Sequence, residues 1–589
     1  MLIQDRLAKL RKLMKKNCIG YYYVPHEDEN LLENTPPNRK RLEWISGFSG
    51  SAGSLLIEEN NLNLFIDGRY TIQSKIEMKN IKCKIHNVSN NNFLDFLKKI
   101  KNKKKKLGID IKTISVKNYS AIKKICDEKN IHIVNLDLSL IDIIWKRSLE
   151  VQKTNEIFFL KKKYTGIDLK EKKKKLVNYI DNEKVDFLYI ENSESVAWLT
   201  NIRGKDLDFT PITFCSALIN RKYIYLFMED TNISHTIKKK LGKFTKFLNK
   251  SDFSVFLEKN NHKYFKIIMD DKYTSFYNFN VIANMTKNII FKPDIIQDLK
   301  SIKNIQEINC IKKAHIHDGK ALCKFLYWFK NKKGNMSELD IVKKIDMLRM
   351  KNREYISRSF PTIAGSGPNG AIIHYQPSKK SNRLLKDNDI LLLDSGAQYL
   401  SGTTDVTRTI IRGKAKKDQI LDYTLVLKGH LKINLARFPF GITGNYLDFL
   451  ARQSLWNNGK DFAHSTGHGV GFCLNVHEGP FSISTKNSHK IANGMVFSNE
   501  PGYYKTNCYG IRIENLVTAK SQNLFGKKFI VIENFTLAPY ELDLVDKTLL
   551  CNEEKNWLNI YHRDVVKKIS PLLEENERVW LKKACKEII

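Results

Sequence analysis

The sequence predicts a multidomain α/β protein in which an α+β domain follows two smaller α/β domains, and three observations support this. The chain of 589 residues is too long to fold around one hydrophobic core. Its composition, with 42% hydrophobic and 11% aromatic residues, is that of a globular protein. Helical and strand-like segments alternate in the first half, whereas strand patterns dominate from about residue 355 onward.

Two helix–strand units in the first half share one order of elements. Helices are expected over residues 7–17 and 169–181, and each precedes an apolar strand, over Gly20–Pro25 and Asp186–Ile190. In both units a tryptophan-containing segment then leads to a glycine, after a loop that is about 12 residues longer in the first unit. We interpret the units as diverged copies of one α/β domain.

The second half begins with helices. One long helix is expected from about 299 to 330, and another after Ser337, a suitable N-cap with Asp340 at the third helical position. The long helix presents an apolar face made of Ile302, Ile305, Ile308, Ile311 and Ala314.

Strands and a helical tail complete the chain. Strands are expected at Ala371–Tyr375, Ile390–Asp394, Thr404–Ile411, Met495–Asn499 and Gly510–Thr518. The tail is expected to be anchored by Trp557, Tyr561 and Trp580. The predicted domains are residues 1–147, 148–297, 298–545 and, for the C-terminal extension, 546–589.

The formal net charge of +36 could suggest a nucleic-acid or membrane partner. The basic runs are short, scattered and without interleaved aromatic residues, which favours solvated surfaces, so neither partner is expected. The ten cysteines include no C-x-x-C pair, and no run approaches 18 apolar residues. The basic, amphipathic N-terminus is interpreted as the first helix of a folded domain, and a cytoplasmic location is expected.

Four carboxylates and one histidine lie in three short segments between residues 390 and 515. The segments are LDSG and TTDV (Leu393–Gly396, Thr403–Val406), HSTGHGVG (His464–Gly471), and NEPG and GIRIEN (Asn499–Gly502, Gly510–Asn515). The candidate ligands are Asp394, Asp405, His468, Glu500 and Glu514. Most of them adjoin apolar, strand-forming residues, where an unpaired charge costs several kcal/mol, and two divalent cations would supply the counter-charge.

The type of ligand limits the choice of metal. Carboxylates with a single imidazole suit Mn²⁺, Co²⁺, Fe²⁺ or Zn²⁺, and the lack of thiolates argues against a structural zinc site. Two bridged cations can hold a hydroxide and polarise a carbonyl group. His374, His464 and His477 lie in similar segments and are expected to serve as donors to a substrate carbonyl or an oxyanion.

One further motif points elsewhere and is set aside. Gly365–Gly370 fits G-x-G-x-x-G, but it contains Pro368 and is expected to lead into a strand instead of opening a helix. A dinucleotide site is therefore not expected.

Longer segments around these residues carry a family resemblance. They are Gly47–Gly53, Asp67–Tyr70, Ala197–Gly204, Asn369–Tyr375, Leu393–Arg408, His464–Pro480, Asn499–Tyr503, Gly510–Asn515 and Trp557–His562. In them the chain resembles the aminopeptidase P family of Xaa-Pro aminopeptidases, and most closely its long, three-domain cytosolic branch. The resemblance implies two creatinase-like α/β domains followed by a pita-bread metallopeptidase domain.

The resemblance also implies an activity. Asp394, Asp405, His468, Glu500 and Glu514 would bind two Mn²⁺ ions, and a hydroxide between them would attack the carbonyl group before proline. Glu500 would also move the proton, while His374, His464 and His477 would orient the substrate and Arg512 would hold ligand carboxylates. Short peptides with proline at position 2 are the expected substrates, and a homodimer is expected because the family is commonly dimeric.

Two alternatives stay open at this point. The chain could be a prolidase-type dipeptidase or a methionine aminopeptidase. Faster cleavage of Xaa-Pro dipeptides than of tripeptides would favour the dipeptidase. It could also be a binding scaffold that retained the fold, an alternative that the charge of +36 motivates. Salt-dependent RNA binding by protein without bound metal would support this alternative.

Overall fold

The computed structural model describes residues 2–100, 106–146, 156–229, 233–259 and 264–589. The chain divides into two compact units. Unit 1 contains the chain up to Leu160, Ile167–Asp208 and Ile212–Ile296, and unit 2 contains Lys161–Gly166, Phe209–Pro211 and Gln297–Ile589. The predicted boundary between residues 147 and 148 lies outside the described residues, and the four-part division stays a prediction.

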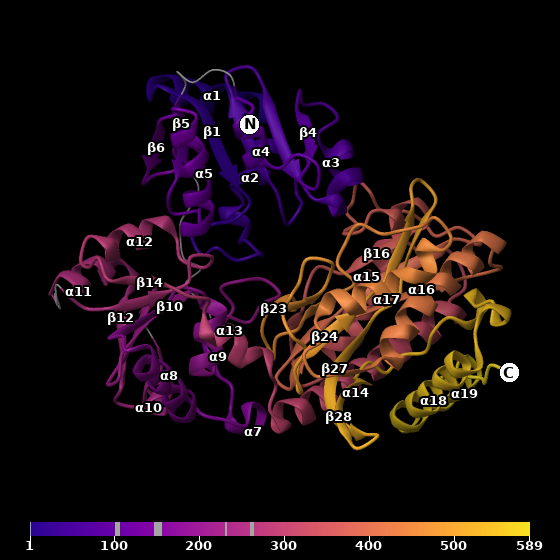
Figure 1. Ribbon diagram of the computed structural model, residues 1–589. Coiled ribbons are helices and arrows are strands. Elements are labelled where there is room, and N and C mark those ends of the chain that lie inside the picture. Colours follow the sequence, from indigo (N-terminus) through magenta and orange to yellow (C-terminus); the bar gives the residue numbers. More distant parts are fainter. Residues whose placement is uncertain (1, 101–105, 147–155, 230–232, 260–263) are drawn as a thin grey trace. The chain divides into compact units, whose positions relative to one another are not determined.

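Unit 1, coloured indigo to magenta in Figure 1, contains two six-stranded sheets. The first has the order β4-β3-β2-β1-β5-β6, with β1 at Ile19–Pro25, β2 at Ser54–Glu58, β3 at Leu62–Ile66, β4 at Lys84–Asn87, β5 at Lys106–Asp110 and β6 at Ile133–Leu136. The second has the order β12-β11-β10-β8-β13-β14, with β8 at Phe187–Ile190, β10 at Cys215–Ile219, β11 at Ile224–Met228, β12 at Thr245–Asn249, β13 at Ile267–Met269 and β14 at Ile289–Phe291.

The two sheets have the same connectivity. In each, the first strand pairs antiparallel with the second and parallel with the fifth. The second and third strands are antiparallel, and the two outer pairs are parallel. This identity of order and direction confirms that the two helix–strand units are copies of one α/β domain.

Helices pack on both sheets. The predicted first helices are α1 (Ile3–Lys16), which buries Leu7, Leu10 and Met14, and α8 (Leu169–Glu183). The others in the first copy are α2 (Arg41–Ser46), α3 (Thr71–Glu77), α4 (Phe93–Lys98), α5 (Val116–Glu128) and α6 (Leu140–Trp145). Those in the second copy are α9 (Ser193–Thr200), α10 (His235–Leu241), α11 (Phe253–Lys259) and α12 (Phe276–Ala283).

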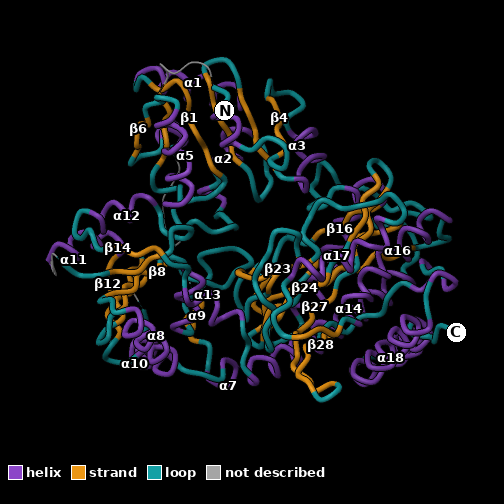
Figure 2. The backbone as a smooth tube through the Cα atoms, in the orientation of Figure 1, coloured by secondary structure: helices purple, strands orange, loops and turns teal. Residues whose placement is uncertain are grey.

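Unit 2 is built from two main sheets and the helices that pack on them (Figure 2). A three-stranded sheet has the order β16-β17-β20, with β16 at Ile363–Ser366, β17 at Ile390–Ser395 and β20 at Val406–Ile411. A six-stranded sheet has the order β21-β28-β27-β24-β22-β23, with β21 at Arg437–Pro439, β22 at Gly467–Gly469, β23 at Glu478–Ile483, β24 at Val496–Asn499, β27 at Asn515–Leu524 and β28 at Lys527–Asn534. Helices α16 (Lys417–Leu435) and α17 (Gly444–Trp456) lie against the larger sheet.

The prediction of one continuous helix from about residue 299 is wrong. It is two helices, α13 (Ile295–Ser301) and α14 (Ile305–Asn331), because the Asn304 side chain accepts the N–H of Glu307 and starts a new helix. Ile302 and Ile305 are 46% and 82% exposed, so they do not belong to the predicted apolar face. The next helix, α15 (Glu338–Met350), has the predicted cap of Ser337 and Asp340.

The strand predicted at Ala371–Tyr375 is also wrong. A 3-10 helix at Gly367–Ala371 with Pro368 in its first turn is followed by a loop. The turn packs so closely on a neighbouring strand that a Cβ at Gly510 would lie 1.8 Å from the carbonyl oxygen of Gly370. The strand predicted at Gly510–Thr518 is split into β26 (Tyr509–Arg512) and β27, and Glu514 lies in the break.

The predicted tail forms α18 (Asn552–Ile569) and α19 (Glu575–Ala584), drawn in yellow in Figure 1. Tyr561 is buried, and the Trp557 ring stacks on it at 5.3 Å. The Tyr561 hydroxyl accepts a hydrogen bond from Arg408 of β20 at 3.0 Å. Among the described residues, no helix has the length and apolar character needed to span a membrane.

Candidate metal centre

Asp394 and Asp405 come from two antiparallel strands of the three-stranded sheet. Asp394 lies near the end of β17 and pairs with Thr407 of β20, and Asp405 directly precedes β20. The chain between the two aspartates forms β18 (Ala397–Tyr399) and β19 (Gly402–Thr403). The predicted antiparallel arrangement is confirmed, and it brings both carboxylates to the same end of the sheet.

Glu500 and Glu514 are brought together in the same way by the larger sheet. Glu500 directly follows β24 and Glu514 directly precedes β27, and these strands pair through Asn499 and Asn515. The hairpin of β25 (Gly502–Lys505) and β26 joins the two glutamates. The backbone N–H of Glu514 donates to the carbonyl oxygen of Thr407 at 3.1 Å, which attaches this pair to β20.

His468 lies at the centre of β22, between two glycines that the packing requires. A Cβ at Gly467 would lie 2.0 Å from the Ser498 carbonyl oxygen, and one at Gly469 would lie 2.3 Å from that of Glu478. The Nε2 atom of His468 lies 3.3 Å from Glu500 Oε1 and 3.6 Å from Asp405 Oδ2. Ligand atoms of Asp405, His468 and Glu514 lie within 4.8 Å of one another.

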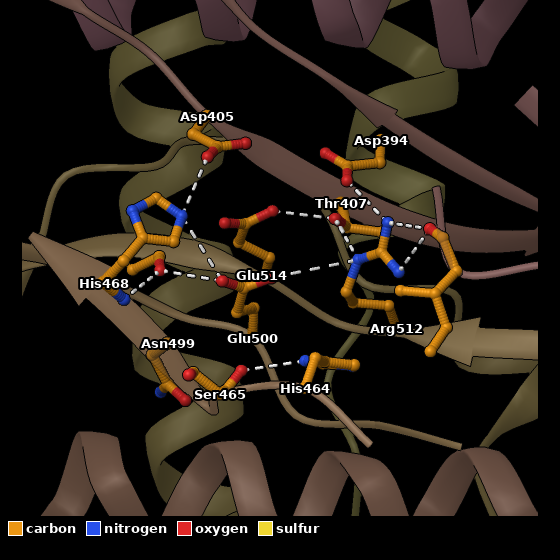
Figure 3. A network of polar contacts seen from close by, with 12 residues as sticks. Asp394, Asp405, Thr407, His464, Ser465, His468, Asn499, Glu500, Arg512 and Glu514 are labelled. Atoms are coloured by element: carbon orange, nitrogen blue, oxygen red, sulfur yellow. Dashed lines mark hydrogen bonds and ion pairs between the residues drawn. The ribbon is translucent and has the colours of Figure 1, made fainter. Parts of the chain in front are cut away.

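Arg512 occupies the other side of the cluster, as Figure 3 shows. Its Nη2 donates to Asp394 Oδ2 at 2.6 Å, and its Nε lies 4.0 Å from Glu500 Oε2. Its Nη1 donates to the Tyr504 hydroxyl at 2.5 Å. Arg512 therefore holds Asp394 and adds one positive charge beside four carboxylates.

The electrostatics of the cluster favour cations. Burial raises the pKa of Asp405 well above its usual range, and Asp394 and Glu500 act in the same direction. Burial raises the pKa of Glu500 to about 7, with Arg512 opposing and Asp394 reinforcing the shift. Burial, followed by repulsion from Asp405, raises the pKa of Glu514 well above its usual range. The negative charges are therefore costly unless positive charge is added among them.

The donor atoms fit divalent cations. Asp394 Oδ1 and Glu514 Oε1 are buried without a hydrogen-bond partner among the described residues. The Nδ1 atom of His468 lies 2.9 Å from the Gly469 carbonyl oxygen, which can only accept, so Nδ1 carries the proton. In the neutral imidazole, Nε2 then directs its lone pair at the carboxylate oxygens, an arrangement that a cation between them would stabilise.

The three accessory histidines lie in different surroundings. The His477 ring is 4.3 Å from that of His468, at an angle of 79°. The Nε2 atom of His464 lies 2.8 Å from the Tyr504 hydroxyl, which also contacts Arg512. His374 is connected to the cluster through its neighbour Ile373, whose carbonyl oxygen accepts a hydrogen bond from Arg512 at 3.4 Å.

The loop that carries His374 is held by a residue that the sequence did not identify. Glu338, buried at the start of α15, accepts hydrogen bonds from Ser366, Asn369, Tyr375 and the Arg383 N–H. Burial raises the pKa of Glu338, and the hydrogen bonds oppose that shift.

Three hydroxyl donors at the cluster were also missed. Thr407 Oγ1 donates to Glu514 Oε2 at 2.7 Å, and Ser498 Oγ donates to Glu500 Oε1 at 3.1 Å. Tyr504 links Arg512 to His464. Thr407 and Ser498 lie two residues from a candidate ligand and Tyr504 lies four away, so proximity in sequence was the signal that could have found them.

Family models match almost the whole chain. The Creatinase/Prolidase N-terminal domain matches residues 6–142, and a second model of that name matches residues 149–307. Metallopeptidase family M24 matches residues 309–521, and the C-terminal region of peptidase M24 matches residues 528–588.

Full-length relatives agree with these models. A probable Xaa-Pro aminopeptidase P from Coprinopsis cinerea is 36% identical, over 98% of this chain and 97% of its own. Xaa-Pro aminopeptidase 1 from Dictyostelium discoideum is 36% identical, over 100% of this chain and 97% of its own. The crystal structure of X-prolyl aminopeptidase from Caenorhabditis elegans, described as a cytosolic enzyme with a di-nuclear active site, is 30% identical and superposes with a TM-score of 0.94 over 100% of both chains.

Proposed function

Because the chain belongs to metallopeptidase family M24 and, within it, to the aminopeptidase P family, we propose that it removes the N-terminal residue from peptides with proline at position 2. The chain is a metallo-aminopeptidase, a hydrolase with two creatinase-like domains and a pita-bread catalytic domain. The observation that carries the proposal is the cluster in which Asp405, Glu500 and Glu514 lie close to His468 while Arg512 holds Asp394.

Asp394, Asp405, His468, Glu500 and Glu514 would hold two divalent cations, for which we propose Mn²⁺. When bound, such a pair would activate a water molecule as the nucleophile and polarise the scissile carbonyl group. The buried, unpartnered oxygens of Asp394 and Glu514 and the lone pair of His468 support this assignment.

The residues of the chain have separate roles in the proposed reaction. Glu500 accepts the proton of the nucleophile at a carboxylate oxygen and delivers it to the proline nitrogen as the peptide bond breaks. His374, His464 and His477 orient the substrate and donate to the developing oxyanion. Arg512 fixes Asp394 through the 2.6 Å hydrogen bond. One water is consumed, and the products are an amino acid and a peptide that begins with proline.

The test is cleavage of an Arg-Pro-Pro peptide by metal-stripped protein with and without added Mn²⁺. We expect release of arginine only with the metal, and little release from a matched Arg-Ala-Pro peptide. Faster hydrolysis of an Arg-Pro dipeptide than of the tripeptide would instead support the dipeptidase alternative. Intact peptides with metal shown to be bound would contradict the proposed function.

We also propose a homodimer in the cytosol. Helix α17 exposes Tyr446, Phe449 and Trp456, with exposed fractions of 60%, 50% and 42%, and such an aromatic face supports self-association. Sedimentation should give twice the chain mass for the wild type and the chain mass for Phe449→Glu.

The ten free cysteines support a reducing compartment, which cell fractionation would test.

A further inference from the structure

Three buried charged side chains lie together at the start of β23, and one of them, Glu478, directly follows the accessory histidine His477. Lys300, Lys303 and Glu478 are 2%, 4% and 3% exposed. The Nζ atom of Lys300 lies 2.9 Å from Glu478 Oε2, and the Nζ atom of Lys303 donates to Glu478 Oε1. Each oxygen of one carboxylate therefore faces its own ammonium group.

Stability alone does not account for this arrangement. Lys300 and Lys303 both face Glu478, and the negative charge of the buried Glu307 also acts on Lys303. Burial lowers the pKa of Lys303, which reflects the cost of keeping it charged there. Because desolvation offsets the attraction in a buried ion pair, such pairs add little net stability, and a role in positioning Glu478 is the better explanation.

The backbone of Glu478 is connected to the segment that carries His468. Glu478 is the first residue of β23 and pairs with Gly469, the residue after His468. His477 precedes Glu478, and its ring contacts that of His468 at 4.3 Å.

The lysines are themselves held firmly. Lys300 lies in the last turn of α13, and Lys303 lies between α13 and α14, where its N–H donates to the Gly494 carbonyl oxygen at 2.9 Å. The neighbouring Ile302 forms a backbone bridge with Met495, just before β24. This segment is therefore fixed to the sheet that carries His468 and Glu500, and it can act as a rigid support for Glu478.

We propose that Lys300 and Lys303 are positioning residues that fix the plane of the Glu478 carboxylate and thereby hold His477 against the metal centre. Two ammonium groups, one on each oxygen, prevent the rotation that a single lysine would allow. The role assigned to His477 rests on the proposed function, whereas its placement by the lysines does not. The lysines touch neither substrate nor metal.

The test uses Lys300→Met and Lys303→Met in the full-length, Mn²⁺-loaded protein. Either change leaves one lysine on Glu478, so both variants should fold and retain their metal, measured by thermal unfolding and mass spectrometry. We expect kcat for the Arg-Pro-Pro peptide to fall by about 10- to 100-fold. Lys428→Met is the matched control because it removes the ion pair with the buried carboxylate of Glu554, away from His477, and it should leave kcat unchanged.

A double-mutant cycle distinguishes positioning from a general loss of structure. If the lysines act through His477, Lys303→Met should lower kcat less than about twofold in the His477→Ala background. The same loss in both backgrounds, or a loss that follows metal content, would overturn the proposal.

A second measurement does not depend on activity. In a crystal structure of the Lys303→Met variant, the His477 ring should leave its 4.3 Å contact with His468. An unmoved His477 would overturn the proposal. If the wild type cleaves no Xaa-Pro peptide, the proposed function fails, and the position of His477 still decides the role of the lysines.

Discussion

Neutral donors, as well as the arginine, orient the carboxylates of the candidate metal centre. Thr407 and Ser498 each direct a hydroxyl group at one glutamate, and Arg512 holds Asp394. These contacts use one oxygen of each carboxylate and leave Asp394 Oδ1 and Glu514 Oε1 without a partner among the described residues. Side chains fixed in this way have little freedom to lose when they coordinate a cation.

At the residue scale, Glu500→Ala should abolish cleavage. The substitution removes both a proposed ligand and the group that moves the proton, so kcat for the Arg-Pro-Pro peptide should fall below detection in steady-state assays. Glu533→Ala is the control, since Glu533 makes partly exposed ion pairs with Lys312 and Lys520. An active Glu500→Ala enzyme would exclude the assigned mechanism.

Glu338→Gln tests the support of the His374 loop. The substitution replaces one carboxylate oxygen, which accepts hydrogen bonds, by an NH2 group, which can only donate. Ser366, Tyr375 and the Arg383 N–H all donate to Glu338, so their hydrogen bonds cannot all persist. We expect kcat to fall about tenfold while metal content is retained.

Asp340→Asn is its control on the same helix. It weakens the hydrogen bonds that the Asp340 carboxylate accepts from the Ser337 N–H and hydroxyl, and it should leave kcat unchanged. Full activity of Glu338→Gln would show that the loop does not depend on this carboxylate.

At the scale of elements, the C-terminal helix α18 is tied to the metal centre through Arg408. Arg408 donates to the carbonyl oxygens of Glu514 and Ala538 and to the Tyr561 hydroxyl, so one side chain connects α18 with the strand break that carries a proposed ligand. The same charge acts on His562 of α18. Burial lowers the pKa of His562 from 6.5 to about 4, and Arg408 acts in the same direction.

This shift makes a prediction for stability against pH. The unfolded chain binds a proton at His562 below pH 6.5, whereas the folded chain does so only near pH 4. The stability contributed by the neutral ring is therefore present above pH 6.5 and is lost toward pH 4, by about 1.4 kcal/mol per pH unit.

Urea unfolding at pH 7, 6 and 5 should show this loss in the wild type and a smaller loss in His562→Gln. The two proteins share every other titrating group, so the difference in slope isolates His562. Equal slopes would contradict the neutral, buried histidine.

At the scale of the whole molecule, all five proposed ligands belong to unit 2 although they are spread over 121 positions of the chain, from Asp394 to Glu514. Their convergence depends on two sheets that meet where β17, β20, β24 and β27 end or begin. The like charges that this brings together couple metal binding to folding.

The stabilisation by Mn²⁺ should therefore grow with pH. In the metal-free protein the pKa of Glu500 is raised from 4.5 to about 7, so stability linked to this proton is present below pH 4.5 and is lost as pH rises through 7. Bound cations remove the repulsion that causes the loss. Thermal unfolding with and without Mn²⁺ should give a larger increase in Tm at pH 8 than at pH 5.5, and Asp394→Asn should reduce the increase. An increase independent of pH would contradict the coupling.

Much of the candidate metal centre could be predicted from the sequence, Arg512 included, whereas the contacts of Glu338 could not. Asp394, Asp405, His468, Glu500 and Glu514 stand beside glycines, prolines and strand-forming residues, so local patterns already predict two pairs of antiparallel strands with a glycine-flanked histidine. Glu338 lies more than 50 positions before Asp394, and nothing in its local sequence predicts that it binds a distant loop. The roles of all these residues stay predictions until the variants are measured.

The sequence by itself determined the type of element along most of the chain, the duplication in unit 1 and the motifs of the family, because these depend on short-range periodicity and on residues close in the chain. Tertiary structure decided which side chains are buried. Ile302 and Ile305 fit a helical apolar face yet are exposed, while Lys300 and Lys303 are buried against Glu478. Burial depends on what packs there from distant segments, and that information is not local.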